Sequence, residues 1–138
     1  MPVLQNAPYN LPYQTLIEVR ATAYNSYGFA LQPSDINSAG AVMRRVPDQM
    51  APPSEVSSTE NTIVVQWQSL SGLEAGDSDI LSYNLYWDDA SGALDIELID
   101  AIANTFTVTG LVGGNNYSFK VRARNIYGYG AFSDVFLL

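Results

Sequence analysis

The chain contains no cysteine and no histidine. Without cysteine, no disulfide can form and no thiolate can serve as a nucleophile or a metal ligand. Without histidine, the chain lacks the commonest general base near neutral pH and the commonest transition-metal ligand. The composition therefore excludes zinc sites and histidine-based catalytic triads, and we expect no catalytic residue, no cofactor and no metal.

Basic residues and long apolar runs are also scarce. Six Lys and Arg residues stand against 14 Asp and Glu residues, which gives a formal net charge of −8. Such a surface repels the phosphates of nucleic acids and of anionic membranes. No apolar run approaches the ~20 residues that a membrane helix needs, and residues 1–6 lack the pattern of a signal peptide. We therefore expect neither nucleic-acid binding nor membrane insertion, and the signal of a secreted parent protein would lie upstream.

What the chain does contain is an internal repeat. Residues 117–128 (YSFKVRARNIYG) have a weaker copy at residues 17–28 (IEVRATAYNSYG), displaced by one hundred positions. Leu111 matches Leu11 at the same offset, and Ser133 matches Ser34 one residue out of step. Because 138 residues cannot hold two units of that length, the repeat predicts one complete unit preceded by the end of another, as in a tandem array.

The complete unit has the pattern of a β-sheet protein. Val, Ile, Thr, Tyr, Phe and Trp cluster in short runs that Gly, Pro, Asn and Ser separate, which is typical of strands and turns. Alternation places the side chains of Trp67, Tyr83 and Leu85 on inner faces, and it also turns Leu94, Ile96 and Leu98 inward in a fourth strand. Seven strands without helical periodicity predict an all-β Greek-key sandwich. We expect these strands at residues 54–59, 62–67, 80–87, 94–98, 105–109, 117–124 and 132–138.

Several residues follow one another in an order that a known family shares. They are Ala51-Pro52-Pro53, the inward Trp67, the run from Ile80 to Leu85, Leu111 six residues before Tyr117, and Asn125 to Gly130 with Ser133. Together they resemble the recurrent positions of the fibronectin type III family, whose fold is an immunoglobulin-like seven-stranded sandwich. The resemblance implies a tyrosine corner, in which the Tyr117 hydroxyl bonds to an upstream backbone group. Its structural core would include Trp67, Tyr83, Leu111 and Tyr117.

The repeat and the prolines predict three segments. Residues 1–46 would be the last two strands of a preceding module, a partial module like a β-hairpin, with Ile17 where the corner tyrosine would stand. Its first strand would span residues 11–25, with Ile17, Val19, Ala21 and Ala23 inward, and residues 32–40 would hold its second strand. The proline-rich residues 47–53 would be an extended linker, because proline fits neither a helix interior nor a central strand. Residues 54–138 would form the complete module.

Four aromatic residues are candidates for contact with a partner protein. Tyr86, Tyr127, Tyr129 and Phe132 cannot all fit inside so small a sandwich, and tyrosines on loops are common contact residues. Packing on an adjacent domain and stacking on sugar rings are the alternatives. Asn116 opens the acceptor sequence Asn-Tyr-Ser for N-glycosylation. A calcium site is a further alternative, because carboxylates are numerous in one stretch. These acidic residues are Glu74, Asp77, Asp79, Asp88, Asp89, Asp95 and Asp100.

The features together predict a non-catalytic structural spacer and protein–protein interaction module. It would belong to a tandem fibronectin type III array in a cell-surface or extracellular protein, with neighbouring modules and an unidentified protein as partners. A carbohydrate- or calcium-dependent adhesive module is the alternative. Residues 11–40 would leave an apolar face without companion strands. The alternatives are disorder of this segment, docking on an edge of the complete module, and pairing between two chains in a homodimer, of which we expect the pairing.

Overall fold

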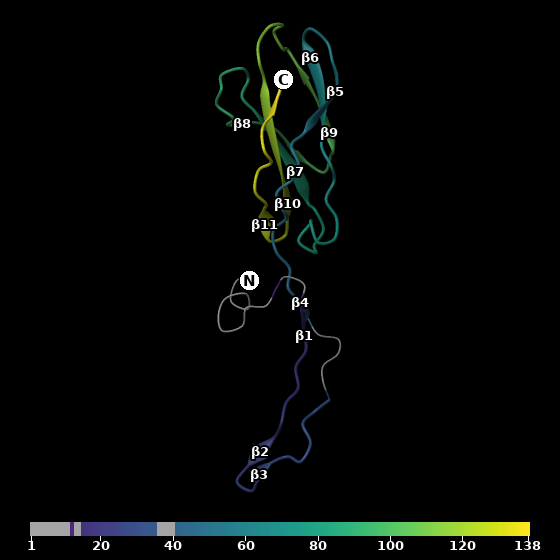
Figure 1. Ribbon diagram of the computed structural model, residues 1–138, viewed down its shortest axis with the longest axis vertical. Helices are drawn as coiled ribbons and strands as arrows, with labels where there is room; N and C mark the ends of the chain where they lie inside the picture. The colour runs from purple at the N-terminus through teal and green to yellow at the C-terminus, as the bar shows by residue number, and fades with distance from the viewer. Residues whose placement is uncertain (1–11, 13–14, 36–40) are drawn as a thin grey trace. The chain divides into compact units, whose positions relative to one another are not determined.

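The computed structural model describes residue 12, residues 15–35 and residues 41–138. The chain forms two compact units, Met1–Arg44 and Arg45–Leu138. Both contain strands, which Figure 1 labels in chain order. Leu11 and residues 36–40, which the sequence analysis placed in strands of the first unit, lie outside the described residues.

The second unit is an all-β sandwich of two antiparallel sheets, which confirms the predicted fold class (Figure 1). The smaller sheet has the order β5 (Ser54–Ser58), β6 (Thr62–Gln66), β9 (Thr105–Thr109). The larger sheet has the order β11 (Gly128–Tyr129), β10 (Ser118–Asn125), β7 (Ser82–Trp87), β8 (Ile96–Ala101), and β12 (Phe136–Leu137) also pairs with β10. The chain changes sheets after β6, β8 and β9, as a Greek-key connection requires.

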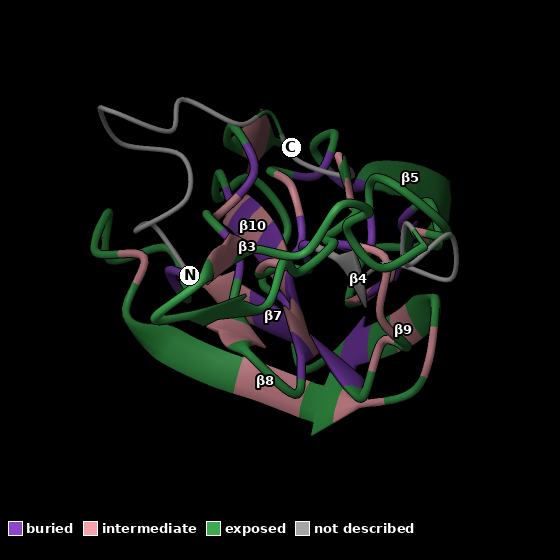
Figure 2. Ribbon diagram, turned by 90° about the horizontal axis from the view of Figure 1, so that it is seen from below, coloured by how far each residue is buried: buried purple, intermediate pink, exposed green. Residues whose placement is uncertain are grey.

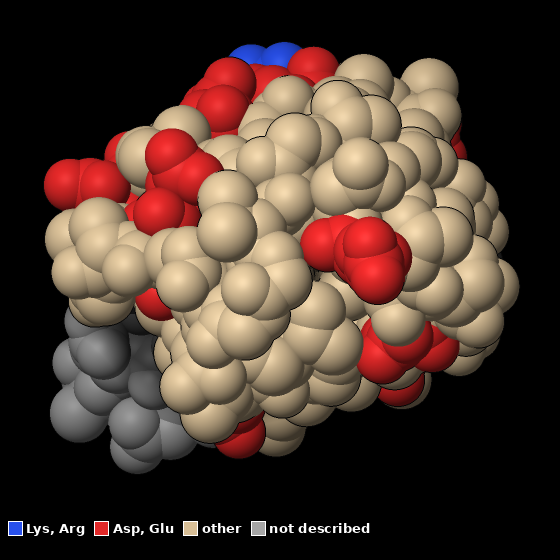
Figure 3. All heavy atoms as spheres, turned by 90° about the horizontal axis from the view of Figure 1, so that it is seen from above, with Lys and Arg blue, Asp and Glu red and all other residues tan. Residues whose placement is uncertain are grey.

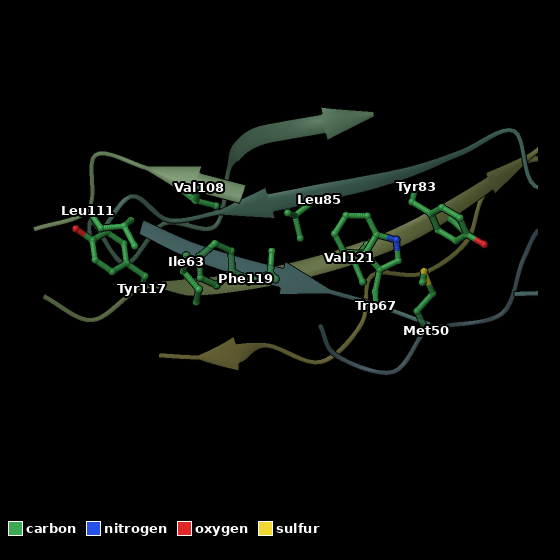
Figure 4. Close-up of a cluster of buried hydrophobic side chains, with 12 residues drawn as sticks. Met50, Ile63, Trp67, Tyr83, Leu85, Val108, Leu111, Tyr117, Phe119 and Val121 are labelled. Carbon is green, nitrogen blue, oxygen red and sulfur yellow. The ribbon is translucent and has the colours of Figure 1, made fainter. Parts of the chain in front are cut away.

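The core lies between the two sheets and follows the alternation of their strands. On β10 every second side chain is buried, and Phe119, Val121 and Ala123 are fully covered. Ile63 and Val65 on β6 face them from the other sheet, and Leu85 on the neighbouring β7 lies beside Val121. Figure 4 shows this cluster extending from Leu111 and Tyr117 at one end to Trp67, Tyr83 and Met50 at the other. Burial is concentrated on β7 and β10, whereas β5 is exposed (Figure 2).

The fourth strand differs from the prediction because it contains a β-bulge. The strand runs from Ile96 to Ala101, and its pairing with β7 shifts between Leu85 and Tyr86. Leu85 lies opposite Ile99, whereas Tyr86 lies opposite Glu97. The extra residue reverses the alternation, so Leu98 and Ile99 both pack on the core while Ile96 is exposed. The predicted inward position of Ile96 is therefore wrong.

The predicted seventh strand is interrupted. In residues 132–138 only Phe136–Leu137 form a strand, and β11 pairs with the other end of β10. Between them the amide of Ser133 donates to the carbonyl of Val121 (2.7 Å), and the amide of Val121 donates to the Ser133 hydroxyl (3.1 Å). A side-chain oxygen thus replaces one backbone acceptor, which keeps the segment against β10 without regular pairing.

Residues 47–53, the predicted linker, contain no helix or strand and pack on the second unit. Met50 and Pro53 are buried, and Met50 belongs to the core cluster. The amide of Asp48 donates to the carbonyl of Glu74 (2.8 Å), and the Gln49 side chain donates to the carbonyl of Phe132 (2.9 Å). The segment belongs to the second unit because its apolar side chains complete that core.

The first unit consists of short antiparallel pairs. β1 (Leu16–Ile17) pairs with β4 (Ala41–Val42), and β2 (Tyr24–Asn25) pairs with β3 (Gly28–Phe29). The predicted continuous strand of residues 11–25 is therefore reduced to β1 and β2 within the described residues. Val19, Ala21 and Ala23, which were predicted to face inward, are exposed. The described part of this unit provides no second sheet to cover them.

Both units contain the same hairpin, and its hydrogen bonds repeat bond for bond. The Asn25 side chain accepts from the amide of Tyr27, and the Asn125 side chain accepts from that of Tyr127, each at 2.9 Å. The amide of Ala30 donates to Ala23, as that of Gly130 donates to Ala123. Ser34 and Ala21 exchange the amide–carbonyl and amide–hydroxyl bonds that Ser133 and Val121 exchange. The repeat seen in the sequence is thus also a structural repeat.

Candidate interaction surface

The outer face of β10 gathers three of the four basic residues of the second unit. Lys120, Arg122 and Arg124 alternate along the strand with the buried Phe119, Val121 and Ala123. The period of two that turns the apolar side chains into the core turns these three onto the other face. Residues 45–138 hold 12 of the 14 acidic residues, so this strand is the basic region of an acidic unit.

Aromatic rings separate these cations. The Arg122 guanidinium lies 4.0 Å from the ring centroid of Tyr129 and 4.3 Å from that of Phe132. The Lys120 ammonium lies 4.3 Å from the Phe132 ring, which meets the Tyr86 ring edge to face at 5.2 Å. Each such contact contributes about 0.5–1 kcal/mol at an exposed site. We call this arrangement the cation–aromatic ladder; its members are Lys120, Arg122, Arg124, Tyr86, Tyr129 and Phe132.

Hydrogen bonds continue the ladder across β7 to β8. Nε of Arg122 donates to Oδ1 of Asn84 (3.0 Å), and Nδ2 of Asn84 donates to Oε2 of Glu97 (2.9 Å). Nε of Arg124 donates to the Ser82 hydroxyl (3.2 Å). Asn84 and Ser82 are buried although they point away from the core, because the ladder covers them. The larger sheet is therefore packed on both faces.

A phenol–carboxylate pair closes the ladder. The Tyr129 hydroxyl donates to Oδ2 of Asp100 at 2.8 Å. Partial burial opposes ionisation of Asp100, but hydrogen bonds from Ser82 and Tyr129 and the charges of Arg124 and Arg122 outweigh it and lower its pKa below the ordinary value. The pKa of Tyr129 is raised, first by its hydrogen bond to Asp100 and then by burial and the carboxylate charge. The pair holds the Tyr129 ring over the guanidinium groups.

The structure separates the four predicted contact residues into two groups. Tyr86, Tyr129 and Phe132 belong to the ladder, where their ring faces already contact Lys120 or Arg122. Tyr127 lies in the turn between β10 and β11, is 51% exposed and makes no ring contact within the described residues. The turn also exposes the neighbouring Ile126 (75%). Two adjacent apolar side chains are thus exposed at this turn.

Asn125 fixes the turn to two other segments. Its Nδ2 donates to the carbonyls of Arg45 (2.7 Å) and Ala75 (2.9 Å), while its Oδ1 accepts from the amide of Tyr127. The side chain is fully buried and uses both amide donors and its acceptor. It thus joins three parts of the second unit: residues 45–53, which we call the incoming segment, the loop before β7, and the turn before β11. The presentation of Ile126 and Tyr127 depends on this one side chain.

The incoming segment contributes to the same end of the unit. An ion pair joins Arg45 to Asp48, and this hydrogen bond to Arg45 lowers the pKa of the Asp48 carboxyl. Gly76 and Gly130 lie so close to this segment that a methyl group on either would overlap with the carbonyl oxygen of Arg45 or of Pro47. Val46, which lies beside Gly128, and Leu73, whose carbonyl accepts from Arg45, are exposed. With Ile126 and Tyr127 they form what we call the apolar end.

The four predicted core residues lie in the cluster between the sheets. Trp67, Tyr83, Leu111 and Tyr117 are all buried. The amide of Val112 donates to the Tyr117 hydroxyl (2.8 Å), which is the geometry of a tyrosine corner. The Tyr83 hydroxyl accepts from the amide of Leu70 (2.9 Å). Neither the role of Asn125 nor the ladder was predicted from the sequence. Basic residues at alternate positions, together with nearby aromatic residues, were the available signal for the ladder.

The acidic residues do not converge. In the described part of the chain, no group of three or more Asp, Glu, His or Cys side chains is arranged to hold a metal ion. Asp88 instead accepts hydrogen bonds from the amides of Ala90 and Ser118, and Asp100 bonds to Tyr129. Figure 3 shows acidic side chains scattered between neutral atoms on the face that it presents. Asn116 is exposed immediately before the buried Tyr117.

Within the same described residues, no helix has the length and apolar character needed to cross a membrane. The second unit has shallow hollows beside its loops. One has a volume of about 400 Å³ and is lined by residues such as Pro52, Gln66 and Asn104. An open hollow of this kind does not enclose a ligand as an active-site pocket does.

Comparisons with known proteins agree with this architecture. The profile described as "Fibronectin type III domain" matches residues 51–136. Ephrin type-A receptor 5 of Gallus gallus is 30% identical over 144 residues, which cover 91% of this chain and 14% of the receptor. Ephrin type-B receptor 6 of Homo sapiens is 34% identical over 88 residues, which cover 63% of this chain and 8% of the receptor. The chain thus spans about one seventh or less of these curated relatives.

Two solved structures illustrate the likeness of the fold. The sixth fibronectin type III domain of human fibronectin type III domain containing protein 3 has a TM-score of 0.58 and 27% identity, covering 67% of this chain and 83% of that one. Domains A168–A170 of titin have a TM-score of 0.60 at 19% identity, covering 85% of this chain and 38% of that one, which speaks for the fold alone. The matches confirm the family resemblance read from the sequence.

Proposed function

The chain belongs to the fibronectin type III family, and we propose that it is a non-catalytic spacer and protein–protein interaction module from a tandem array in a cell-surface or extracellular protein. The observation that carries the proposal is the hairpin that occurs twice with the same hydrogen bonds. Two copies of one supersecondary element in one chain are the mark of a repeat array, in which each unit has the same construction.

The first unit is, in this proposal, the last two strands of a preceding module. The compact unit ends at Arg44, close to the boundary at residue 46 that the sequence predicted. The alignment with the type-A ephrin receptor includes most of this unit as well as the second, because it covers 91% of the chain. The curated relatives are receptors by name, which supports placement at the cell surface.

The spacer role follows from how the second unit is closed. Its core is sealed between the sheets, the ladder packs the outer face of the larger sheet, and Asn125 fastens the incoming segment. When such a module is stretched, the force acts on its hydrogen bonds and on its packed core. We expect force spectroscopy on the chain, held at its two ends, to give one abrupt unfolding event. The length gained should match residues 45–138 at about 3.6 Å per residue. Gradual extension without an abrupt event would contradict the spacer role.

The interaction role falls to the apolar end. Exposed apolar side chains rimmed by polar groups mark contact surfaces, and tyrosine is common in them. The proposed partners are neighbouring modules, a second copy of the chain and a protein that contacts Ile126 and Tyr127. A photo-reactive residue in place of Tyr127 should cross-link to protein on the cell surface, whereas the same residue in place of the exposed Val112 should not. Equal labelling at both positions would count against this surface.

Asn116 is a proposed glycan acceptor in such a setting. Its side chain is exposed, and the buried Tyr117 anchors the next position. Protein produced through a eukaryotic secretory route should lose mass on treatment with a peptide N-glycosidase. The Asn116→Gln variant should carry no such mass, and an unchanged mass in the unsubstituted protein would show that the acceptor is unused.

A further inference from the structure

The described residues of the first unit include a strand edge without a partner strand, and the second unit defines its position. In the second unit, the carbonyls of Ser118 and Arg124 accept from the amides of Asp88 and Leu81, so the even-numbered residues of β10 bond toward β7. The odd-numbered Val121 and Ala123 bond toward Ser133 and Gly130. The hairpin repeats at an offset of one hundred, so the corresponding edge of the first unit consists of Glu18, Arg20, Thr22 and Tyr24.

Among the described residues, no strand takes the place beside this edge that β7 takes in the second unit. Ala21 and Ala23 bond within their hairpin, as their counterparts do. For Glu18, Arg20 and Thr22, the described residues provide no backbone hydrogen-bond partner. An exposed edge of this kind recruits another strand. The side chains next to it are exposed as well, including Val19 at 59%.

We propose that this edge pairs antiparallel with the same edge of a second copy of the chain, with Val19 opposite Val19 on the two-fold axis. The inference rests on the proposed assignment of the first unit as an incomplete module, and it specifies the second copy as the partner of that unit. A two-fold axis is the commonest symmetry of homo-oligomers and makes an edge self-complementary. Because only even-numbered residues present free backbone groups, they must lie opposite even-numbered residues.

The charges select one register among those that the backbone allows. With Val19 on the axis, Glu18 of each copy lies opposite Arg20 of the other, which gives two attractive cross-strand pairs. A shift that centres Glu18 on the axis places two carboxylates opposite each other, and one that centres Arg20 places two guanidinium groups opposite each other. Like charges directly opposite destabilise a strand pair. The chosen register also places Ile17 opposite Ala21, so the apolar side chains share one face.

The test is the association of the full chain and of charge-reversal variants in analytical ultracentrifugation. The unsubstituted chain should form a dimer that dissociates on dilution. Glu18→Arg or Arg20→Glu alone should raise the dimer Kd at least about tenfold, because each places like charges opposite each other twice. The double variant should return to within about threefold of the original Kd. A chain that stays monomeric at all concentrations would overturn the proposal.

A mixing experiment distinguishes this register from any other. When the Glu18→Arg chain is mixed with the Arg20→Glu chain, every cross-strand pair again joins opposite charges, so the two should form a heterodimer although neither forms a dimer with itself. The control is Asp35→Arg, an exposed reversal in the same unit that is outside the pairing and should change Kd less than about twofold. Absence of the heterodimer, or a single reversal without effect, would overturn the register.

The fluorescence of Trp67 and Trp87 reports the second unit in every variant, because both tryptophans lie there. Its unfolding midpoint should stay unchanged. A monomeric chain that still unfolds abruptly under force would refute the pairing while leaving the spacer function standing, so the two failures can be told apart.

Discussion

The two copies of the hairpin share the hydrogen bonds within the hairpin and differ in burial and in their contacts with other segments. Both place an Asn side chain on the amide two residues later, and both use a Ser hydroxyl to bridge the strands. Yet Phe119 in the second copy is fully buried, whereas Val19 at the matching position is 59% exposed. Tyr127 is half covered beside the incoming segment, and Tyr27 is 98% exposed.

The difference separates what a hairpin specifies from what stabilises it. The turn geometry comes from a few local residues, such as the glycine at position 28 or 128 with its positive φ. Stability comes from the apolar face, which needs the strands of the other sheet. Because the hydrogen bonds within the hairpin are the same in both copies, a difference in stability between them reports on packing and on the bonds to other segments, such as those of Asn125 to Arg45 and Ala75. Matched substitutions at positions one hundred apart can measure it.

The largest difference in stability between matched substitutions should come from the inner face of the strand. Phe119→Ala should destabilise the second unit by about 3–5 kcal/mol, because it empties a fully buried ring site. The matched Val19→Ala in the first unit should change that value by no more than about 0.5 kcal/mol, as at exposed sites. Denaturant unfolding followed by tryptophan fluorescence measures both. Equal losses would mean that the first unit contributes to the core of the second.

The next contrast concerns the asparagine of each turn. Asn125→Ala removes three hydrogen bonds, so the second unit should lose about 3 kcal/mol at about 1 kcal/mol for each bond. Asn25 makes the equivalent bond to Tyr27 but is exposed, so Asn25→Ala should cost under about 0.5 kcal/mol. Amide hydrogen exchange of Tyr127 should also accelerate in the Asn125→Ala variant. Unchanged exchange there would show that the turn holds its shape without the side chain.

The third comparison exchanges the residues at two matched positions, Gly130 in the second unit and Ala30 in the first. A methyl group on Gly130 would overlap with the carbonyl of Pro47, so Gly130→Ala should destabilise the second unit by about 1–3 kcal/mol through overpacking. The first copy already has alanine at this position, and Ala30→Gly should leave the second unit unchanged. Thermal unfolding of both variants tests the pair. A neutral Gly130→Ala would mean that the incoming segment moves aside at little cost.

Much of the fold could be read from the sequence because it depends on alternation. The inner faces of β6, β7 and β10 follow the period of two through Val65, Leu85 and Val121, and each of these is fully buried. The bulge in β8 could not be read, because Leu94, Ile96 and Leu98 alternate perfectly in a strand that in fact begins at Ile96 and pairs with a shift. A bulge is a property of the strand pair and leaves no mark in one strand.

The candidate surface was harder to predict, because it depends on contacts between distant segments. The aromatic residues could be identified in the sequence, but their contacts could not. Lys120 and Arg122 contact the rings of Tyr86, Tyr129 and Phe132, whereas Tyr127 lies in the turn. The packing of the incoming segment could not be predicted, because its prolines indicate an extended chain but not where that chain packs. Met50 is buried because Trp67 and Tyr83 leave space beside it at that end of the core.

The smallest contrast is pH-dependent and concerns Tyr129, whose counterpart in the first copy is Phe29. Because the folded pKa of Asp100 is lowered, its ionised form stabilises the fold above the unfolded pKa of about 3.9, and this contribution is lost as the pH falls through the folded pKa. Because the pKa of Tyr129 is raised, its protonated form stabilises the fold below the unfolded pKa of about 10, and this contribution is lost as the pH rises through the folded pKa.

Tyr129→Phe should therefore lower stability only between these pH limits, by about 0.2–0.5 kcal/mol after screening by solvent. Melting temperatures at acidic, neutral and strongly alkaline pH measure the window, and Tyr127→Phe is the control because its hydroxyl has no hydrogen-bond partner among the described residues. A difference that stays constant at all pH values would show that Tyr129 acts through its ring on Arg122 alone.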